Sequence, residues 1–196
     1  RAGAYVYRAD CPDCKACIPI RISPDAFEPS KSQRRVFERN RDLSVTITKK
    51  ADDFVTDEKV SLFRAYDKRH NPGTEKSFDE AKKTLIDMNG IRRTAEGGKY
   101  EAFYSGTLNM DYRCSGTLVG VGIIDTGAAS LSSNYFYYDT SDETKKRSIG
   151  TYSILREIEL CGRFRLQRYY LGYWLKDCKS MVYKSNFKPH ELLIDG

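Results

Sequence analysis

The sequence predicts a mixed α+β fold, in which strands and helices share one layered core. Apolar residues recur at helical spacing through residues 52–89 and again over Thr151–Phe164. From Lys99 onward their spacing changes to two, which is typical of strands. A strongly apolar strand is expected at Arg168–Trp174, after the second helical segment, and no internal repeat or low-complexity tract interrupts the pattern.

The first fifty residues contain two expected strands, an expected helix and a further strand. A short strand is expected at Tyr5–Tyr7. Ile18–Ile22 is apolar and β-branched, but Pro19 cannot donate a backbone hydrogen bond, so we expect an edge strand there. The pattern becomes helical over residues 30–40, and Leu43–Thr48 alternates as a half-buried strand should.

Two helices are expected in the first long helical segment, paired as a helical hairpin. Thr56 and Ser77 are suitable N-cap residues, because their hydroxyls can accept a hydrogen bond from the first turn. The Pro and Gly of Asn71–Thr74 break the helical pattern, and a second helix is expected at Phe78–Met88 with Gly90 at its end.

The second half is expected to begin with three antiparallel strands joined by short turns, at Tyr100–Tyr104, Gly116–Asp125 and Ala129–Tyr138. The amphipathic helix and the final strand named above complete it. The predicted regions are a cysteine-containing N-terminal module (1–50), a helical section (51–98) and a C-terminal domain (99–196).

Composition excludes some classes of protein. The chain is 40% hydrophobic and 31% charged, and it has no stretch near the roughly 20 apolar residues that a membrane span needs, so no membrane partner is expected. Residues 1–50 hold eleven Lys and Arg against six Asp and Glu, a net +5 of the total +6. This asymmetry favours an anionic partner at the N-terminal end.

Cys11, Cys14 and Cys17 stand at i, i+3 and i+6, a spacing that lets thiolates share zinc or an iron–sulfur cluster. A closed zinc site needs a fourth ligand, so three reduced, packed thiols are the alternative. The clustered spacing indicates a reducing compartment, and we expect a cytoplasmic protein. The candidates for a fourth ligand are Cys114, Cys161, Cys178, His70, His190 and the segment upstream.

Three further segments have the chemistry of a binding site. Ser30–Arg35 combines hydroxyl, amide and guanidinium donors that suit a carboxylate or phosphate, although a solvated helix start is the plain alternative. The small residues of Ser148–Thr151 open a helix and can present backbone N–H groups to a phosphate or an oxyanion, or simply cap the helix. Gly172 within a strand invites close approach of a ligand or another backbone.

These segments together resemble the aminoacyl-tRNA–protein transferases, the eukaryotic arginyltransferases and their bacterial leucyltransferase relatives. The resemblance covers residues 1–43 and 116–193 in the family's order. The motifs that carry it are CPDCKACIPIR (11–21), PSKSQRR (29–35), SIGTYSILREIEL (148–160), YYLGYWLKDC (169–178) and MVYKSNFKP (181–189).

The resemblance implies a GNAT-type, acetyltransferase-like mixed sheet core fused to the cysteine-containing module. It also implies transfer of an aminoacyl group, leucine by preference and arginine as the alternative, from aminoacyl-tRNA to the α-amine of proteins that begin with Asp or Glu. The product is then marked for degradation in an N-degron pathway. Charged tRNA and such proteins are the expected partners, without DNA.

The chemistry assigns roles within this expectation. An aminoacyl ester is already activated, so the transfer requires no cofactor. Asp125 and Tyr138 are candidates for orienting the amine or accepting its proton, and the Ser148–Thr151 turn for stabilising the oxyanion. We expect Arg21, Arg34 and Arg35 to bind the acidic acceptor side chain and Lys179 and Lys184 to bind tRNA phosphates, but an exchange of these two roles fits the same chemistry. The substrate-binding candidates are Arg21, Gln33, Arg34, Arg35, Ser148, Gly150, Thr151, Tyr170, Lys179 and Lys184.

Two other functions remain open at this point. An acyl-CoA-dependent N-acetyltransferase would use the same core, although the full Gly-rich pyrophosphate loop is missing. A non-catalytic RNA-binding metal module would use the cysteines and the N-terminal charge.

Overall fold

A seven-stranded mixed sheet forms the centre of the molecule, in the strand order β2-β5-β6-β7-β8-β1-β9. The computed structural model describes residues 11–94 and 98–194. All neighbouring strands of this sheet are antiparallel except β7 and β8, which run parallel. The strands are β1 (Ile18–Ile22), β2 (Leu43–Thr48), β5 (Thr107–Cys114), β6 (Thr117–Thr126), β7 (Ser130–Tyr138), β8 (Arg168–Trp174) and β9 (His190–Leu192). A separate hairpin pairs β3 (Ile91–Arg93) with β4 (Tyr100–Ala102).

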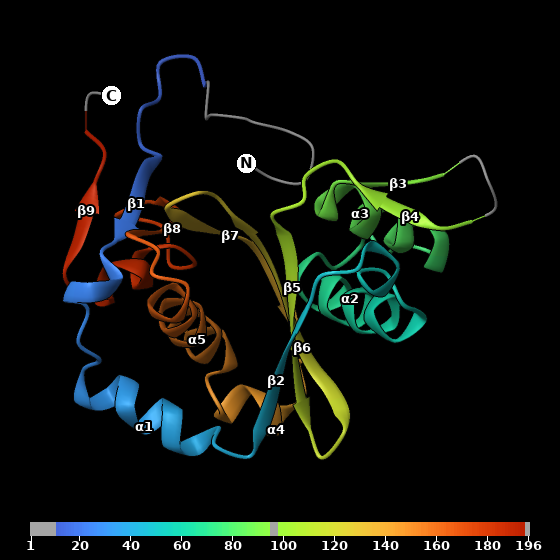
Figure 1. Cartoon of the computed structure of the whole chain (residues 1–196), viewed down its shortest axis with the longest axis horizontal. Coiled ribbons are helices and arrows are strands. Elements are labelled where there is room, and N and C mark those ends of the chain that lie inside the picture. The colour runs from blue at the N-terminus through green and yellow to red at the C-terminus, as the bar shows by residue number, and fades with distance from the viewer. Residues whose placement is uncertain (1–10, 95–97, 195–196) are drawn as a thin grey trace.

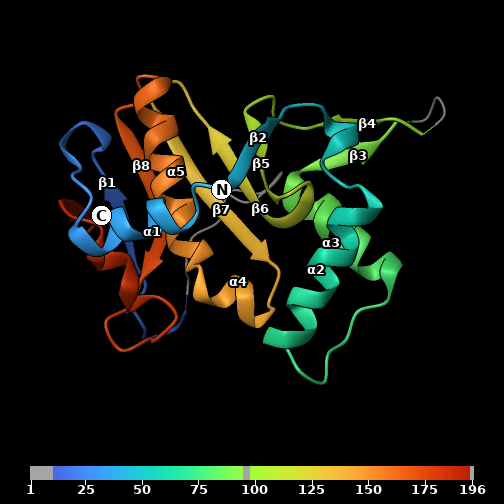
Figure 2. The same ribbon diagram turned by 90° about the horizontal axis from the view of Figure 1, so that it is seen from below.

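Helices cover both faces of the sheet (Figures 1 and 2). α1 and α5 lie on one face, and α2 and α3 lie on the other. Each face has its own buried apolar cluster, and β6 contributes to both because it is buried along nearly all of its length. The helices are α1 (Lys31–Arg39), α2 (Asp57–His70), α3 (Phe78–Asn89), α4 (Asp142–Lys146) and α5 (Ile149–Arg163), and short 3-10 helices are Pro24–Ala26, Ala51–Asp53 and Val182–Asn186. Within the two described ranges, no helix is long and apolar enough to cross a membrane.

The expected starts of α1, α2 and α3 are confirmed, and their caps explain them. The Ser30 hydroxyl accepts from the Gln33 backbone, while the Gln33 side chain accepts from the Ser30 backbone, so two end donors are satisfied reciprocally. Ser77 begins α3 in the same way, and Thr56 caps α2. Gly90 ends α3 in the left-handed conformation, with φ of 59°, that glycine adopts without strain.

The prediction of an edge strand at Ile18–Ile22 is wrong. β1 lies between β8 and β9, with a strand paired on each side. Pro19 is tolerated inside the sheet because the pairing with β8 is irregular next to it. The Pro19 carbonyl still accepts from the Leu193 backbone N–H at 3.0 Å, so the acceptor of this residue is used although it has no donor.

The expected strand set of the second half needs correction. Tyr100–Tyr104 does not join the main sheet, because only Tyr100–Ala102 is extended and it pairs with β3. Its expected place is taken by β5, which pairs with both β2 and β6 and was not predicted. β5 is buried on both faces and includes the polar Asn109 and Asp111, so its sequence lacks the alternation of a half-buried strand.

Three smaller elements were also not predicted: β3, α4 and β9, which have three to five residues each. The helix expected from Thr151 begins two residues earlier, at Ile149. The strands β6 and β7 are confirmed. The strand expected at Tyr5–Tyr7 lies outside the described residues.

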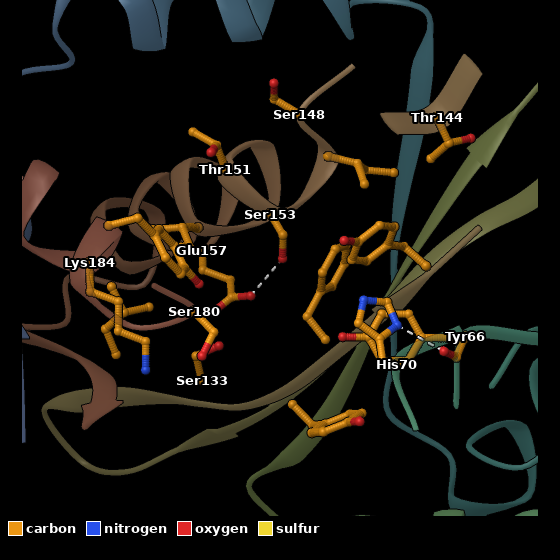
Figure 3. A pocket seen from close by; sticks show the side chains of 18 of the residues that line it. Tyr66, His70, Ser133, Thr144, Ser148, Thr151, Ser153, Glu157, Ser180 and Lys184 are labelled. Carbon is orange, nitrogen blue, oxygen red and sulfur yellow. Dashed lines mark hydrogen bonds between the residues drawn. The ribbon is translucent and has the colours of Figure 1, made fainter. Parts of the chain in front are cut away.

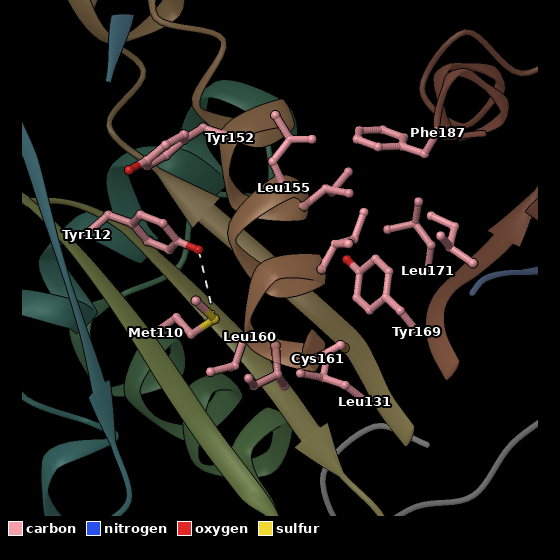
Figure 4. Packing of buried hydrophobic residues seen from close by; sticks show 14 of the residues in the cluster. Met110, Tyr112, Leu131, Tyr152, Leu155, Leu160, Cys161, Tyr169, Leu171 and Phe187 are labelled. Atoms are coloured by element: carbon pink, nitrogen blue, oxygen red, sulfur yellow. Dashed lines mark hydrogen bonds between the residues drawn. The ribbon is translucent and has the colours of Figure 1, made fainter. Parts of the chain in front are cut away.

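The connection from β7 through α5 to β8 positions the candidate site. α5 packs its apolar side on the sheet (Figure 4), where Tyr152, Leu155 and Ile158 are buried. The parallel pairing of β7 with β8 covers only Ser130–Ser132 opposite Arg168–Tyr170. Beyond that point the two strands are not hydrogen-bonded to each other, so the rest of β7 has an open edge.

Candidate functional site

A cavity of about 550 Å³ lies along the open edge of β7 (Figure 3). Its lining comes from both helical layers, because Tyr66 and His70 of α2 contribute from one face and the first half of α5 from the other. Figure 3 shows Glu157 in the middle, with Lys184, Ser133 and Ser180 on one side of it and Tyr66 and His70 on the other. A substrate in this cavity is therefore accessible to groups from both layers.

Glu157 is a fully buried carboxyl group in the cavity wall. Its Oε1 accepts from the Ser153 hydroxyl at 2.9 Å, and its Oε2 accepts from the Tyr169 hydroxyl at 2.8 Å. Ser153 in turn accepts from the Tyr112 hydroxyl at 3.3 Å. Glu157 has no ion pair with any described residue, so hydroxyl dipoles alone stabilise its charge. The two carboxylate oxygens keep lone pairs that can accept from a further donor.

Burial raises the pKa of the Glu157 carboxyl, and the hydrogen bonds from Tyr169, Ser133 and Ser153 oppose that rise. Gly122 of β6, which has no side chain, leaves space for the Glu157 carboxyl. A Cβ at Gly122 would lie 3.5 Å from Glu157 Oε1, so a larger side chain there would press on the carboxyl. A carboxyl group with a raised pKa beside a cavity is suited to accept and return a proton near neutral pH.

The N-terminus of α5 opens into the same cavity. Ser148 is its N-cap with φ of 55°, a left-handed conformation, and its side chain makes no capping hydrogen bond. The first N–H groups of a helix have no acceptor within the helix, so Ile149, Gly150 and Thr151 present donors at the positive end of the helix dipole. These groups can stabilise a phosphate or a developing oxyanion.

A second cavity, of about 540 Å³, adjoins the first. Both are lined by Ser148, Thr151 and Tyr183. The remaining lining of the second cavity is largely polar and comes from the start of α1, with Ser30 and Gln33, and from the chain after the last 3-10 helix. The N-terminus of α5 thus lies between the first cavity, which contains the buried Glu157 carboxyl, and the second, largely polar cavity.

The cavity brings together five of the predicted site residues: Tyr138, Ser148, Gly150, Thr151 and Lys184. Gln33 lines the adjoining cavity, where it is buried and its Nε2 donates to the Asn186 carbonyl at 3.3 Å. Tyr138 belongs to an aromatic group at the α2 end, with its ring centroid 5.2 Å from that of Tyr66, which stacks on His70 at 4.0 Å.

Asp125 lies elsewhere, near the opposite end of the β6–β7 pairing. Asp125 is opposite Ser132, whereas Tyr138 is opposite Gly120. Its carboxylate is buried and accepts from the Thr107 hydroxyl at 2.6 Å and from Asn134 Nδ2 at 2.7 Å. The structure therefore does not bring the two predicted catalytic residues together.

The remaining candidates do not line either cavity. Arg21 forms an ion pair with Glu191 at 2.6 Å and lies beside Tyr170, around a smaller hollow of about 170 Å³. Arg34 donates to the Pro29 carbonyl, and Arg35 is exposed on α1. Lys179 is exposed in the loop after β8.

The three clustered cysteines do not form a ligand set in this structure. Cys11 and Cys14 are exposed around a tight turn, in which the Cys14 N–H donates to the Cys11 carbonyl at 3.3 Å, and Cys17 is half-buried. Nowhere in residues 11–94 and 98–194 do three His, Cys, Asp or Glu side chains converge as metal ligands would. The described residues thus do not fit zinc or a cluster, and no reaction step is derived through either.

Sequence reasoning missed Glu157, although a signal for it exists. Ser153 and Glu157 stand at i and i+4, on the side of α5 that also carries the buried Ile154, Leu160 and Cys161. A Glu on the apolar face of a helix is expected to be buried, and a buried Glu needs partners. Ser133 and Ser180, which lie near it in Figure 3, have no comparable pattern.

The chain is similar to a known protein family and to several known proteins. The family model described as "Arginine-tRNA-protein transferase, C terminus" matches residues 58–194, and the corresponding N-terminus model matches residues 1–35. Among similar proteins, an aspartate/glutamate leucyltransferase of Methylobacillus flagellatus is 35% identical over 199 residues, covering 100% of this chain and 72% of that protein. One of Saccharophagus degradans is 34% identical over 198 residues, covering 100% and 76%.

Solved structures show the fold alone. A Bacteroides thetaiotaomicron protein of unknown function aligns with a TM-score of 0.59 and 13% identity, covering 92% of this chain and 61% of that one. L-PGS from Bacillus licheniformis aligns at 0.54 and 12%, covering 86% and 48%. The predicted acetyltransferase-like α+β core is confirmed. The two family models and these relatives show that the chain belongs to the arginine-tRNA-protein transferases, enzymes that transfer aminoacyl groups from tRNA to proteins.

Proposed function

We propose that this protein transfers leucine from leucyl-tRNA to the α-amine of proteins that begin with Asp or Glu. The observation that carries the proposal is the buried Glu157 carboxyl beside the uncapped N-terminus of α5, in one cavity. Acyl transfer to an amine needs a proton acceptor and an oxyanion site next to each other, and this cavity offers both. The names of the relatives, aspartate/glutamate leucyltransferases, support the donor and the acceptor.

Charged tRNA would approach over a surface formed by α1 and the end of α4, which we call the α1–α4 surface. Arg39 Nη1 donates to the Lys146 carbonyl at 2.6 Å, so the C-terminal ends of these two helices are in contact. The surface carries exposed cations without an ion pair to any described residue: Lys31, Arg35, Arg41 and Lys146. This surface borders both cavities. A tRNA bound to it would place its 3′ end in the second, polar cavity and its aminoacyl ester next to Glu157 in the first.

The chemistry follows from the positions of the groups. The acceptor α-amine has a pKa of about 7.7–8.0, so a useful fraction is neutral near neutral pH. The neutral amine attacks the ester carbonyl, and the N–H groups of Gly150 and Thr151 stabilise the oxyanion. Glu157 accepts the proton that the nitrogen loses and returns it to the ribose oxygen as the C–O bond breaks and the amide remains.

The further consequences are part of the same proposal. A new N-terminal leucine would mark the acceptor for degradation in an N-degron pathway, and a cytoplasmic location would bring the enzyme together with charged tRNA. Arginine stays as the alternative donor. No cofactor is needed for a transfer from an ester that is already activated.

The test is transfer of labelled leucine or arginine from charged tRNA to a peptide that begins with Asp. We expect leucine to be incorporated and the product to lose its free Asp terminus. Incorporation of arginine alone would replace the proposed donor. Acetylation of the peptide from acetyl-CoA, without any aminoacyl transfer, or tRNA binding without transfer would contradict the proposal.

A further inference from the structure

Lys184 is a partly buried ammonium group in the cavity wall, and no carboxylate of the described residues pairs with it. Its Nζ donates to the Tyr173 carbonyl at 2.8 Å, and no described Asp or Glu forms an ion pair with it. A cation withdrawn from water in this way is costly unless an anion or several dipoles compensate it. An ammonium group has three donors, so two remain for a ligand in the cavity.

The backbone of β8 fixes the position of this ammonium group. Gly172 has φ of 83°, and a Cβ built there would lie 3.5 Å from Lys184 Nζ. The lysine therefore rests against a bare stretch of backbone and is held there by the Tyr173 carbonyl. In Figure 3 it lies on the same side of Glu157 as Ser133 and Ser180, opposite Tyr66 and His70, and all of these residues line the cavity.

The other cations are less suited to an anion inside the cavity. Lys145, which also lines the cavity, is exposed and pairs with Asp142 at 3.1 Å. Arg21 is neutralised by Glu191, and Arg34 and Arg35 lie outside the cavity. The α1–α4 surface provides exposed cations for tRNA phosphates, so Lys184 is not required for them.

We propose that Lys184, with the hydroxyl of Ser180, binds the side-chain carboxylate of the acceptor's N-terminal Asp or Glu. This rests on the proposed function, because it names the group that recognises the acceptor in the same site. An acceptor bound in this way has its α-amine within the same cavity as Glu157. A neutral Asn or Gln terminus lacks the charge that compensates the ammonium group, so it leaves a buried cation unpaired.

The test compares Lys184→Met, which keeps the length of the side chain without its charge, with wild type and with Lys176→Met. Lys176 is an exposed lysine in the same connection and lines neither cavity. For each protein, kcat/KM is measured with peptides that differ only in Asp or Asn at the first position, together with KM for leucyl-tRNA. Thermal melting and circular dichroism report whether the variants fold.

We expect Lys184→Met to lower kcat/KM for the Asp peptide about 10- to 100-fold, while Lys176→Met stays like wild type. The Asn peptide should change little, so the preference for Asp collapses, and KM for leucyl-tRNA should be unchanged. Where transfer to the Asn peptide is too slow to follow, the dissociation constants of the two peptides give the same ratio.

Other outcomes separate this inference from the function on which it rests. A wild-type protein that transfers leucine to no acidic peptide contradicts the proposed function itself. A raised KM for leucyl-tRNA with the Asp preference intact would show that the anion at Lys184 is a tRNA phosphate and would overturn the inference. Equal losses for both peptides in a folded variant would also overturn it.

Discussion

At the scale of single residues, the acid–base chemistry of the cavity depends on Glu157. Glu157→Gln keeps the shape of the side chain, and its one carbonyl oxygen can still accept from Ser153 or from Tyr169, but it cannot accept a proton. We expect kcat for leucyl transfer to fall about 10²- to 10⁴-fold, with little change in melting temperature. Single-turnover kinetics with preformed leucyl-tRNA measures the chemical step directly.

The matched control is Glu159→Gln on the same helix. Glu159 is half-buried and pairs with Arg156 and Arg163 away from the cavity, so its loss should leave kcat near that of wild type. A Glu157→Gln variant as active as this control would show that another group takes the proton. Asp125 would then be the next candidate, because it accepts from Asn134, which lines the cavity.

The pH dependence of kcat gives a second expectation for the same carboxyl. Glu157 accepts a proton only when ionised, so activity is lost as the pH falls through its pKa. Because burial raises that pKa, the acid limb should lie above the usual range of a glutamate. The Tyr169 hydroxyl stabilises the ionised form, so Tyr169→Phe should move the limb to higher pH. A pH–kcat profile of wild type and Tyr169→Phe checks this, and an unmoved limb would contradict it.

The site could be predicted from sequence only where its residues are close together in the chain. Ser148, Gly150 and Thr151, which line the cavity, could be proposed because a small-residue turn opening a helix has a local signature. Lys184 was found, but its role depends on what else lines the cavity. Arg21 lies outside the cavity, where it pairs with Glu191, a residue 170 positions away in the sequence. Spacing in the sequence does not contain that information.

At the scale of elements, α2 is fixed to the sheet by a buried charge. Lys59 Nζ pairs with Asp111 of β5 at 2.8 Å and also donates to the Asp53 carbonyl at 2.8 Å. Burial lowers the pKa of Lys59, and Asp111 opposes that shift. Asp111→Leu would leave the ammonium group uncompensated, and we expect it to lower the free energy of unfolding by about 3–5 kcal/mol.

A double-mutant cycle measures this coupling. Lys59→Met combined with Asp111→Leu removes both charges, so it should recover much of the stability that Asp111→Leu loses. Urea unfolding of the four proteins gives the free energies. Strictly additive losses would show that the pair is not coupled. The exposed pair Lys68–Glu75 is a control, because its removal should cost little.

The same strand shows why some elements escaped prediction. Helices with caps were placed correctly, since Ser30, Thr56, Ser77 and Gly90 determine their ends locally. β5 is central and buried on both faces, so its polar residues serve the interior, and the alternation that identifies a half-buried strand is absent. β9 and β3 have only three residues each and depend on their neighbours for pairing.

At the scale of the whole molecule, the uneven charge has a consequence for tRNA. The net +5 of residues 1–50 is concentrated at one end of the sequence, and α1 brings part of it next to α4 and the second cavity. Each phosphate that a cation neutralises releases counterions, so the affinity for tRNA should fall steeply with salt. The peptide substrate, bound in the cavity, should show a much weaker salt dependence.

Replacing Arg35 and Arg41 with glutamine tests this arrangement, because both are exposed and neither pairs with a described carboxylate. We expect the slope of log affinity for leucyl-tRNA against log salt to decrease by about 1–2, with KM for the acceptor peptide unchanged. Lys83→Gln, at an exposed position on α3 across the sheet, should leave the slope as it is. An equal change of slope in both variants would mean that tRNA binding responds to the net charge alone. A change of slope only on replacing Arg35 and Arg41 would locate the acceptor stem on α1, within reach of the cavity that contains Glu157.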